Sequence, residues 1–246
     1  MASIKQREIQ LAGKPQLYQL RRSRRAKHLL LHVDTLGQVE LVVPWRASFK
    51  EAERFIAERH DWLARRVAQA QQRVAGLPRY RFVSGERLPF LGEQLELVIR
   101  RSASRQRARV TRDGKRLVVE APTDTHEPLP AIERWYKKQA RQFVAQSAPP
   151  LAQQIGVTIT RLAIGSYRSQ WGSATKAGRL ALNWRLMLAP AAVMRYVIAH
   201  EVAHLRHPNH SPQFWELVEQ LQPGYRHQRR WLRQHEHELV LRPEIS

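Results

Sequence analysis

Hydrophobic and polar positions alternate with a period of two early in the chain, and a helical period follows. After the Arg-Arg-Ser at 21–23, the segment "VDTLGQVELVVP" is typical of a strand, a glycine turn and a β-branched strand that ends at proline. Ser48 and Glu51 form a Ser-x-x-Glu capping box ahead of an apolar helical stripe that extends to Val67. The pattern predicts a β-β-α unit over about residues 15–75.

The same order of features returns later in the chain. The Arg-Arg-Ser at 100–102 precedes "VTRDGKRLVVEAP", and a helical pattern follows from about Leu129 to Ala145, closed by the prolines at 149–150. This second unit covers about residues 92–147, and a diverged duplication would explain the similarity. Two generic β-β-α units would also look alike, so the repeat is a hypothesis.

Residues 151–246 follow a different pattern, and we expect them to form a second domain after an N-terminal region of residues 1–150. Strict alternation over 179–188, "RLALNWRLML", predicts a strand with leucines and a tryptophan on one face. Pro190 should open a helix that continues to about Arg206, and Ser211 should cap a further helix that clamps the intervening loop. Together the elements predict an α+β fold.

Composition changes this picture mainly through charge. The 246 residues carry a formal net charge of +21, and a surface of this kind attracts polyanions, including nucleic acid. The basic residues concentrate in the segments 20–28 and 100–109, neither of which contains interleaved aromatic residues for stacking on bases. Solvated hairpins in an arginine-rich protein would explain these runs equally well.

The absence of cysteine restricts the chemistry of any metal site. Without thiolates, a metal must be held by histidine, aspartate or glutamate side chains. No apolar run approaches the roughly 20 residues needed to cross a bilayer, so we expect no membrane partner. The first residues, "MASIKQREIQLAG", lack the apolar region of a signal peptide, and we therefore expect a cytoplasmic protein.

The candidate chemistry lies in "HEVAHLRHPNHS", residues 200–211. His200 and His204 lie on the same face of the predicted helix, because residues four apart are stacked one turn above each other. Glu201 lies about 100° further round the helix, within reach of an ion without binding it. This is the His-Glu-x-x-His arrangement, in which two imidazoles hold zinc and the carboxylate takes a proton from the metal-bound water.

Two residues, His207 and His210, are candidates for the third metal ligand. Pro208 should end the helix, since the residue before a proline is pushed out of the α region, and the chain can then fold back. That geometry favours His210, because three imidazoles along one helical line cannot easily form three corners of a tetrahedron. A glutamate of the next helix, Glu216 or Glu219, is the alternative.

Further candidates surround this motif in the sequence. Tyr225 follows the clamp helix and could stabilise an oxyanion, although it could equally be a packed tyrosine. Arg168, Asn183 and Arg185 are candidates for binding the substrate, the arginines through phosphate or carboxylate groups.

Two long segments carry a resemblance to a known family. "RSQWGSATKAGRLALNWRLMLAP" and "YVIAHEVAHLRHPNHSPQFWELV" resemble the YgjP-like metal-dependent hydrolases, relatives of the SprT and WLM zinc peptidases. The resemblance implies a zincin-type fold for the C-terminal domain, one zinc ion on His200, His204 and His210, and Glu201 as the base. Where the family usually has a cysteine after Trp-Gly-Ser, this chain has Ala174, which argues against any role for a thiol.

Three functions are compatible with these features. The first is a zinc metallopeptidase in which an extended peptide pairs with the edge of the 179–188 strand. The second is a nucleoside triphosphate (UTP-type) pyrophosphatase that uses the same metal site, an activity also associated with the YgjP-like branch. The third is a nucleic-acid-binding protein with a structural zinc, and the glutamate beside the histidines argues against it because a structural site needs no base.

Overall fold

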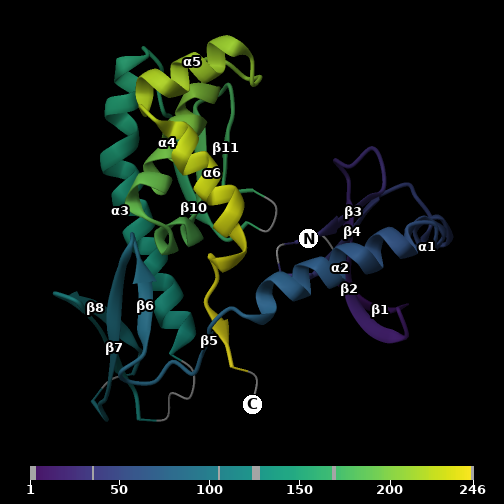
Figure 1. Ribbon diagram of the computed structural model, residues 1–246, viewed down its shortest axis with the longest axis horizontal. Coiled ribbons are helices and arrows are strands. Elements are labelled where there is room, and N and C mark those ends of the chain that lie inside the picture. The colour runs from purple at the N-terminus through teal and green to yellow at the C-terminus, as the bar shows by residue number, and fades with distance from the viewer. Residues whose placement is uncertain (1–3, 35, 105, 124–127, 168–169, 245–246) are drawn as a thin grey trace. The chain divides into compact units, whose positions relative to one another are not determined.

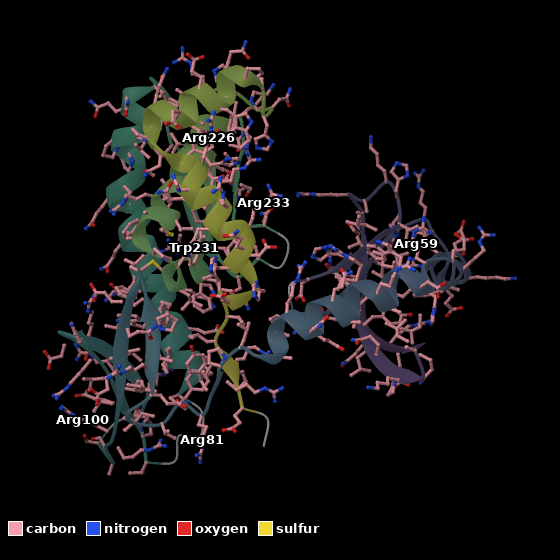
Figure 2. The ribbon with its side chains drawn as sticks, viewed as in Figure 1. Arg59, Arg81, Arg100, Arg226, Trp231 and Arg233 are labelled. Carbon is pink, nitrogen blue, oxygen red and sulfur yellow. The ribbon has the colours of Figure 1, made fainter. Side chains whose placement is uncertain are left out.

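The computed structural model has a mixed α+β fold (Figure 1). It describes residues 4–34, 36–104, 106–123, 128–167 and 170–244. The chain forms two compact units, Met1–Leu77 and Pro78–Ser246. Arginine side chains project from both, for example Arg59 in the first and Arg100 in the second (Figure 2). Among the described residues, no helix combines the length and the apolar character needed to cross a membrane.

The first unit is a four-stranded sheet with two helices. The strands lie in the order β1 (Ile4–Leu11), β2 (Lys14–Ser23), β4 (Val39–Pro44) and β3 (Leu30–Val33). β2 and β4 are parallel, and each outer strand is antiparallel to its neighbour. Leu20 and Leu41 of the sheet share a core with Ile56 and Leu63 of the helices.

The predicted single helix after Ser48 is wrong, because the structure divides it into α1 (Phe49–Ala57) and α2 (His60–Ala75). The capping box is confirmed: the Ser48 side chain accepts from the Glu51 N–H, and the Glu51 carboxylate accepts from the Ser48 N–H. The break lies at Arg59, whose φ of −111° and ψ of 14° leave the helical region. His60 Nε2, 2.8 Å from the Gln10 carbonyl oxygen, anchors the start of α2.

The second unit begins with a sheet of the same design. Its strands lie in the order β6 (Arg87–Phe90), β7 (Glu93–Arg101), β9 (Arg116–Ala121) and β8 (Arg109–Asp113). The central pair is again parallel and the outer pairs are antiparallel. The two sheets therefore share strand order and strand direction, which is the observation that a duplication would produce.

The long helix α3 (Leu129–Gln154) follows this sheet and extends beyond Ala145, where we expected it to end. Pro149 and Pro150 lie inside α3 rather than closing it. Proline in a helix interior removes a backbone hydrogen bond, but Val144, Ala148 and Ala152 continue one buried face past the prolines, and this packing sustains the helix. The division that we expected near residue 150 falls within α3, whereas the compact units divide after Leu77.

A small sheet and three helices complete the second unit. The sheet order is β10 (Arg161–Gly165), β12 (Arg179–Asn183) and β11 (Gly172–Ala174). The helices are α4 (Ala191–His204), α5 (Pro212–Leu221) and α6 (Tyr225–His235). The short pieces are β5 (Arg79–Tyr80) paired with β13 (Arg242–Pro243), and the 3-10 turns η1 (Trp184–Leu188) and η2 (Glu236–Glu238).

The predicted strand over 179–188 is only half correct. It ends at Asn183, whose side chain accepts a hydrogen bond from the Arg185 N–H at 3.2 Å and so caps η1. Trp184 and Leu186–Leu188 are all buried, and a 3-10 turn packed into the core accommodates this run where a two-sided strand would not. β12 is also the central strand of its sheet and has no free edge.

Candidate metal centre

Helix α4 brings the two histidines of the motif to one face, as expected. The helix is buried over most of its length, from Val193 to Ala203, so its orientation is set by packing on the core of the second unit. The rings of His200 and His204 lie 4.8 Å apart between centroids. Glu201 is among the few buried charged residues, with 6% of its surface exposed.

His210 completes the group after the chain turns back. α4 ends at His204, ahead of Pro208, and Ser211 caps α5 by accepting from the Phe214 N–H. His210 Nε2 then lies 3.1 Å from the Nε2 atoms of both His200 and His204.

These distances fit a metal ion. Three ligands at about 2.0–2.1 Å from a tetrahedral metal stand about 3.3–3.4 Å apart. This is close to the 3.1 Å that separates His210 Nε2 from each of the other two nitrogens. Imidazole nitrogens are good donors to zinc and to other divalent transition metals. The donor set therefore suits such an ion, and it leaves one coordination position for water or substrate.

The side chains proposed as alternative third ligands lie outside the group of three histidines. His207 does not join the group through its ring: its carbonyl oxygen accepts from His204 Nδ1 at 3.1 Å, which leaves the His204 Nε2 lone pair for a metal. Glu219 accepts from the Gly224 N–H at 3.0 Å. Among the described residues, the metal-binding group contains neither glutamate, and Glu216 is exposed.

Burial sets the protonation of the site. Desolvation lowers the pKa of His200 to about 3, with further lowering by His204, His210 and Arg229. Desolvation also lowers the pKa of His204, although the hydrogen bond to the His207 carbonyl oxygen acts to raise it. Both imidazoles are therefore neutral near pH 7, the form that binds metal. Desolvation raises the pKa of the Glu201 carboxyl to about 8, which makes it a stronger base than an exposed glutamate.

An aromatic cluster that sequence reasoning missed lies beside the histidines. Trp215 of α5 stacks on His210 with centroids 5.3 Å apart, and on Tyr225 at 5.4 Å. Tyr225 also stacks on Tyr196, whose ring lies 5.9 Å from His200. Tyr225 is thus the first residue of α6 rather than a loop residue, and it shares two neighbours with the metal-binding histidines.

A cation also lies at this cluster. The guanidinium carbon of Arg229 is 4.3 Å from the centre of the Trp215 ring. Burial raises the pKa of Tyr196 to about 12 and the charge of Arg229 partly offsets this, while the same charge adds to the lowering of the pKa of His200. α6 is rich in arginine, and Figure 2 shows Arg226 and Arg233 on the same helix. Only the proximity in space distinguishes Arg229, so sequence alone offered no signal for it.

Gly172 of β11 lies directly against the glutamate. A side-chain carbon at this position would stand 2.5–2.7 Å from the Glu201 Cγ, Cδ and Oε1 atoms. Such distances are well inside van der Waals contact, so only glycine leaves room for the carboxylate. The Trp-Gly-Ser segment of the sequence contained this signal, but its meaning needed the fold.

The structure gives contacts for two of the three predicted substrate-binding residues. Asn183 is buried, and its amide donates to the carbonyl oxygens of Tyr167 and Gln170. Arg185 belongs to η1, with its guanidinium carbon 5.9 Å from the Trp184 ring centre. Arg168 lies outside the described residues.

A comparison with known protein families identifies the family of this chain. The family model described as "YgjP-like, metallopeptidase domain" matches residues 27–235. The chain belongs to the YgjP-like family. The predicted resemblance is thereby confirmed, and the match takes in most of both compact units, including all three histidines and Glu201.

Among solved structures, this YgjP-like chain is similar to the crystal structure of the metallopeptidase zymogen of Pyrococcus abyssi abylysin, with 19% sequence identity and a TM-score of 0.33. The similarity covers 43% of this chain and 99% of the zymogen chain. Among curated proteins, none matches. Family membership and the histidine group together support a metal-dependent hydrolase of the metallopeptidase type.

Proposed function

We propose that the protein is a zinc metallopeptidase in which His200, His204 and His210 hold the metal and Glu201 is the general base. The observation that carries this proposal is the convergence of three imidazole nitrogens, with His210 Nε2 at 3.1 Å from both His200 Nε2 and His204 Nε2, beside a buried carboxylate. The described residues offer three ligands, and a site with three protein ligands is typical of catalysis, whereas structural zinc sites close with a fourth.

The residues of the chain supply the proton transfers. A divalent metal bound there would polarise the scissile carbonyl and make a water molecule more acidic. Glu201 accepts the proton of the attacking water and passes it to the amide nitrogen as the carbon–nitrogen bond breaks. Burial raises the pKa of this carboxyl to about 8 in the metal-free protein, and the charge of a bound metal would lower it again, so that the carboxylate can accept and return a proton near neutral pH.

The substrate would lie along β11 rather than along β12, the strand that we expected. β11 is at the edge of its three-stranded sheet, so its outer side can pair with an extended peptide. Gly172 connects this edge to the chemistry, since its backbone lies against Glu201. A peptide bound there would bring its scissile carbonyl group close to the water that Glu201 activates.

Tyr225 remains our candidate for stabilising the oxyanion of the tetrahedral intermediate. Its position supports the role, because its ring stacks on Trp215 and Tyr196, which both contact the metal-binding histidines. A phenol hydroxyl that donates to the developing negative charge lowers the barrier most when it is already oriented.

A nucleoside triphosphate pyrophosphatase is the alternative reaction at the same site. The observation in its favour is Arg229, an exposed cation stacked on Trp215 beside His210, where it could hold a phosphate group. Arg168 and Arg185 were the arginines proposed from sequence, and Arg229 joins them because it stacks on Trp215, which itself stacks on His210.

The deciding experiment compares zinc-loaded wild type with Glu201→Gln on an unfolded protein and on a panel of nucleoside triphosphates. Peptide-bond cleavage that falls at least about 100-fold in the variant, at unchanged zinc content, would support the peptidase. The control is Glu216→Gln, which makes the same change on an exposed face of α5. Pyrophosphate release lost in Glu201→Gln, without protein cleavage, would replace the peptidase by the nucleotide hydrolase.

We also propose a zincin-type layout for the second unit and a duplication of the strand motif. Supporting the layout, α4 carries the histidines, β11 lies beside Glu201, and α5 follows the metal loop. Supporting the duplication, both four-stranded sheets have the same strand order and the same strand directions.

A further inference from the structure

The fold brings two distant segments of the first unit together at one edge of its sheet. β2 and β4 are parallel neighbours whose last paired residues are Ser23 and Pro44. The Trp45 N–H donates to the Ser23 carbonyl oxygen at 3.1 Å, directly after both strands end. Because the carboxyl ends of parallel strands meet at the same edge, the basic turn after β2 lies beside the loop that begins at Trp45.

This edge supplies the aromatic residue that the basic run itself lacks. The guanidinium carbon of Arg24 lies 5.0 Å from the centre of the Trp45 ring, and that of Arg22 lies 5.7 Å away. Arg22 is fixed by donating to the carbonyl oxygens of Trp45 and Ala47. The Trp45 side chain is nevertheless 49% exposed, which is unusual for a large hydrophobic residue and leaves ring surface for a ligand.

The positive charge at this edge is not neutralised. Arg24, Arg25 and Lys27 are exposed, and none of them forms an ion pair with a carboxylate in the part of the chain that the structure describes. Elsewhere in the same unit arginines do find such partners, as Arg21 does with Glu40 at 2.8 Å. The charge is therefore concentrated where the tryptophan is exposed.

We propose that this surface, the Trp45 edge (Arg22, Arg24, Arg25, Lys27, Trp45 and Arg46), binds single-stranded nucleic acid. The tryptophan would stack on a base while the surrounding arginines and lysine contact the phosphates. Stacking requires a base that is free of its neighbours, which favours a single strand over a duplex. The proposal is independent of the peptidase reaction, which belongs to the other unit.

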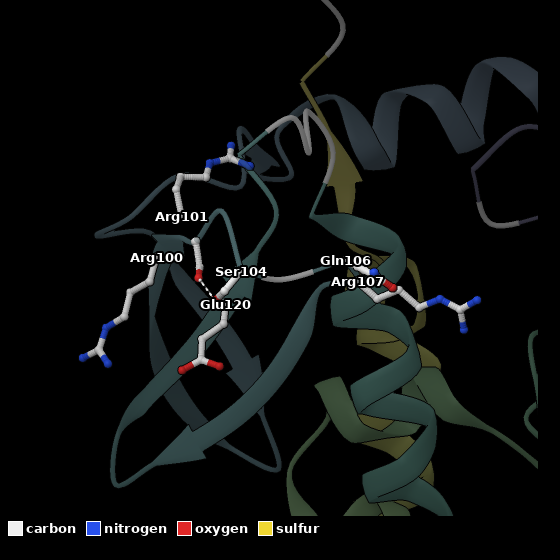
Figure 3. A pocket seen from close by; sticks show the side chains of 7 residues that line it. Arg100, Arg101, Ser104, Gln106, Arg107 and Glu120 are labelled. Atoms are coloured by element: carbon white, nitrogen blue, oxygen red, sulfur yellow. Dashed lines mark hydrogen bonds between the residues drawn. The ribbon is translucent and has the colours of Figure 1, made fainter.

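The second sheet carries a related but purely electrostatic surface. At the same topological position, the turn after β7 lines an open pocket of about 830 Å³. Its lining residues are Arg100, Arg101, Ser102, Ser104, Gln106, Arg107 and Glu120. Figure 3 shows the side chains of Arg100 and Arg107 pointing away from each other, an arrangement suited to an extended polyanion rather than to one small ion. No aromatic residue is among them, so we expect phosphate contacts here without stacking.

The test uses the full-length protein and a fluorescein-labelled oligothymidylate of about 20 nucleotides, which is longer than the roughly 4–16 nucleotides that one single-strand binding site usually covers. Fluorescence anisotropy is measured over a range of salt concentrations. We expect Trp45→Ala to weaken binding about tenfold with little change in the salt dependence. Arg24→Ala/Arg25→Ala should instead reduce the slope of log K against log salt by about 1.4, the value for two phosphate contacts on a single strand.

Two matched controls separate this edge from the general charge of the protein. Trp62 on α2 is 40% exposed, close to the value for Trp45, and Trp62→Ala should leave binding unchanged. Arg65→Ala/Arg66→Ala removes the same charge from an exposed pair on α2 and should reduce the slope less. If Trp45→Ala fails to fold, Trp45→Leu decides, since it keeps an apolar side chain but removes the aromatic face, and it should weaken binding about tenfold where Trp45→Phe retains most of the affinity.

Other outcomes would overturn the proposal. Equal loss of affinity in the Trp45 and Trp62 variants would show that stacking at this edge does not occur. Equal or tighter binding of a duplex of the same length, or of vesicles containing phosphatidylserine, would show that the surface takes another polyanion. No binding at about 50 mM salt, where phosphate contacts are strong, would remove nucleic acid as a partner.

Discussion

At the scale of single residues, the absence of a side chain at Gly172 leaves the space that the Glu201 carboxylate occupies. We expect Gly172→Ala to push the carboxylate out of position, because the added methyl group would lie within 2.7 Å of three Glu201 side-chain atoms. Activity should fall about 100-fold, the usual cost of misplacing a catalytic group by about 1 Å, while zinc content stays at one per chain. The control is Gly76→Ala, where open space and a φ of −87° make the change harmless.

Glu201 also gives a pH dependence to the metal-free protein. Its folded-state pKa, about 8, is raised above its usual 4.5 by burial, so its contribution to stability is complete below pH 4.5 and lost as the pH rises through 8. After chelation, Glu201→Gln should therefore unfold at a higher temperature than wild type at pH 8.5, and the gap should close towards pH 4.5. Thermal unfolding followed by circular dichroism checks this. A constant gap, matched by Glu216→Gln, would contradict it.

At the scale of elements, α5 supports the metal loop through Phe214. This ring is fully buried and contacts all three histidine rings, with centroids 4.4–4.9 Å away. We expect Phe214→Ala to lower the free energy of unfolding by about 3–5 kcal/mol and to weaken zinc binding, because the histidines lose the surface that orients them. Phe90→Ala truncates a similarly buried ring of the β6 core. It should cost similar stability in denaturant titrations yet leave zinc affinity intact.

The elements also show what could be predicted from sequence. Pro190 was sufficient to place the start of α4, the four-residue spacing was sufficient for the pairing of His200 with His204, and Pro208 with Ser211 indicated the turn that returns His210. The prediction for 184–188 was wrong, because an alternating pattern does not distinguish a strand from a 3-10 turn in which Trp184 and Leu186–Leu188 are all buried. Contacts between residues far apart in the sequence produce no periodic pattern along the chain. The contact of Gly172 with Glu201 and that of Arg24 with Trp45 were therefore found only in the structure.

At the scale of the whole molecule, the two units have separate hydrophobic cores, one formed within residues 11–67 and the other within residues 82–241. The three metal-binding histidines all belong to the second. A ligand that binds only the folded form stabilises only the unit that holds it. We therefore expect calorimetry to resolve two transitions, of which zinc at about 100 times its Kd raises one by about 5–10 °C and leaves the other unchanged.

The assignment of these transitions can be checked by a core substitution in the first unit. Leu63 of α2 is fully buried there, so Leu63→Ala should lower the zinc-insensitive transition and leave the zinc-dependent shift of the other intact. If zinc instead moved both transitions together, or if only one transition were seen at every zinc concentration, the units would unfold as one cooperative structure. Separate transitions would mean that the surface around Trp45 can be altered without disturbing the metal site, as the binding experiments require.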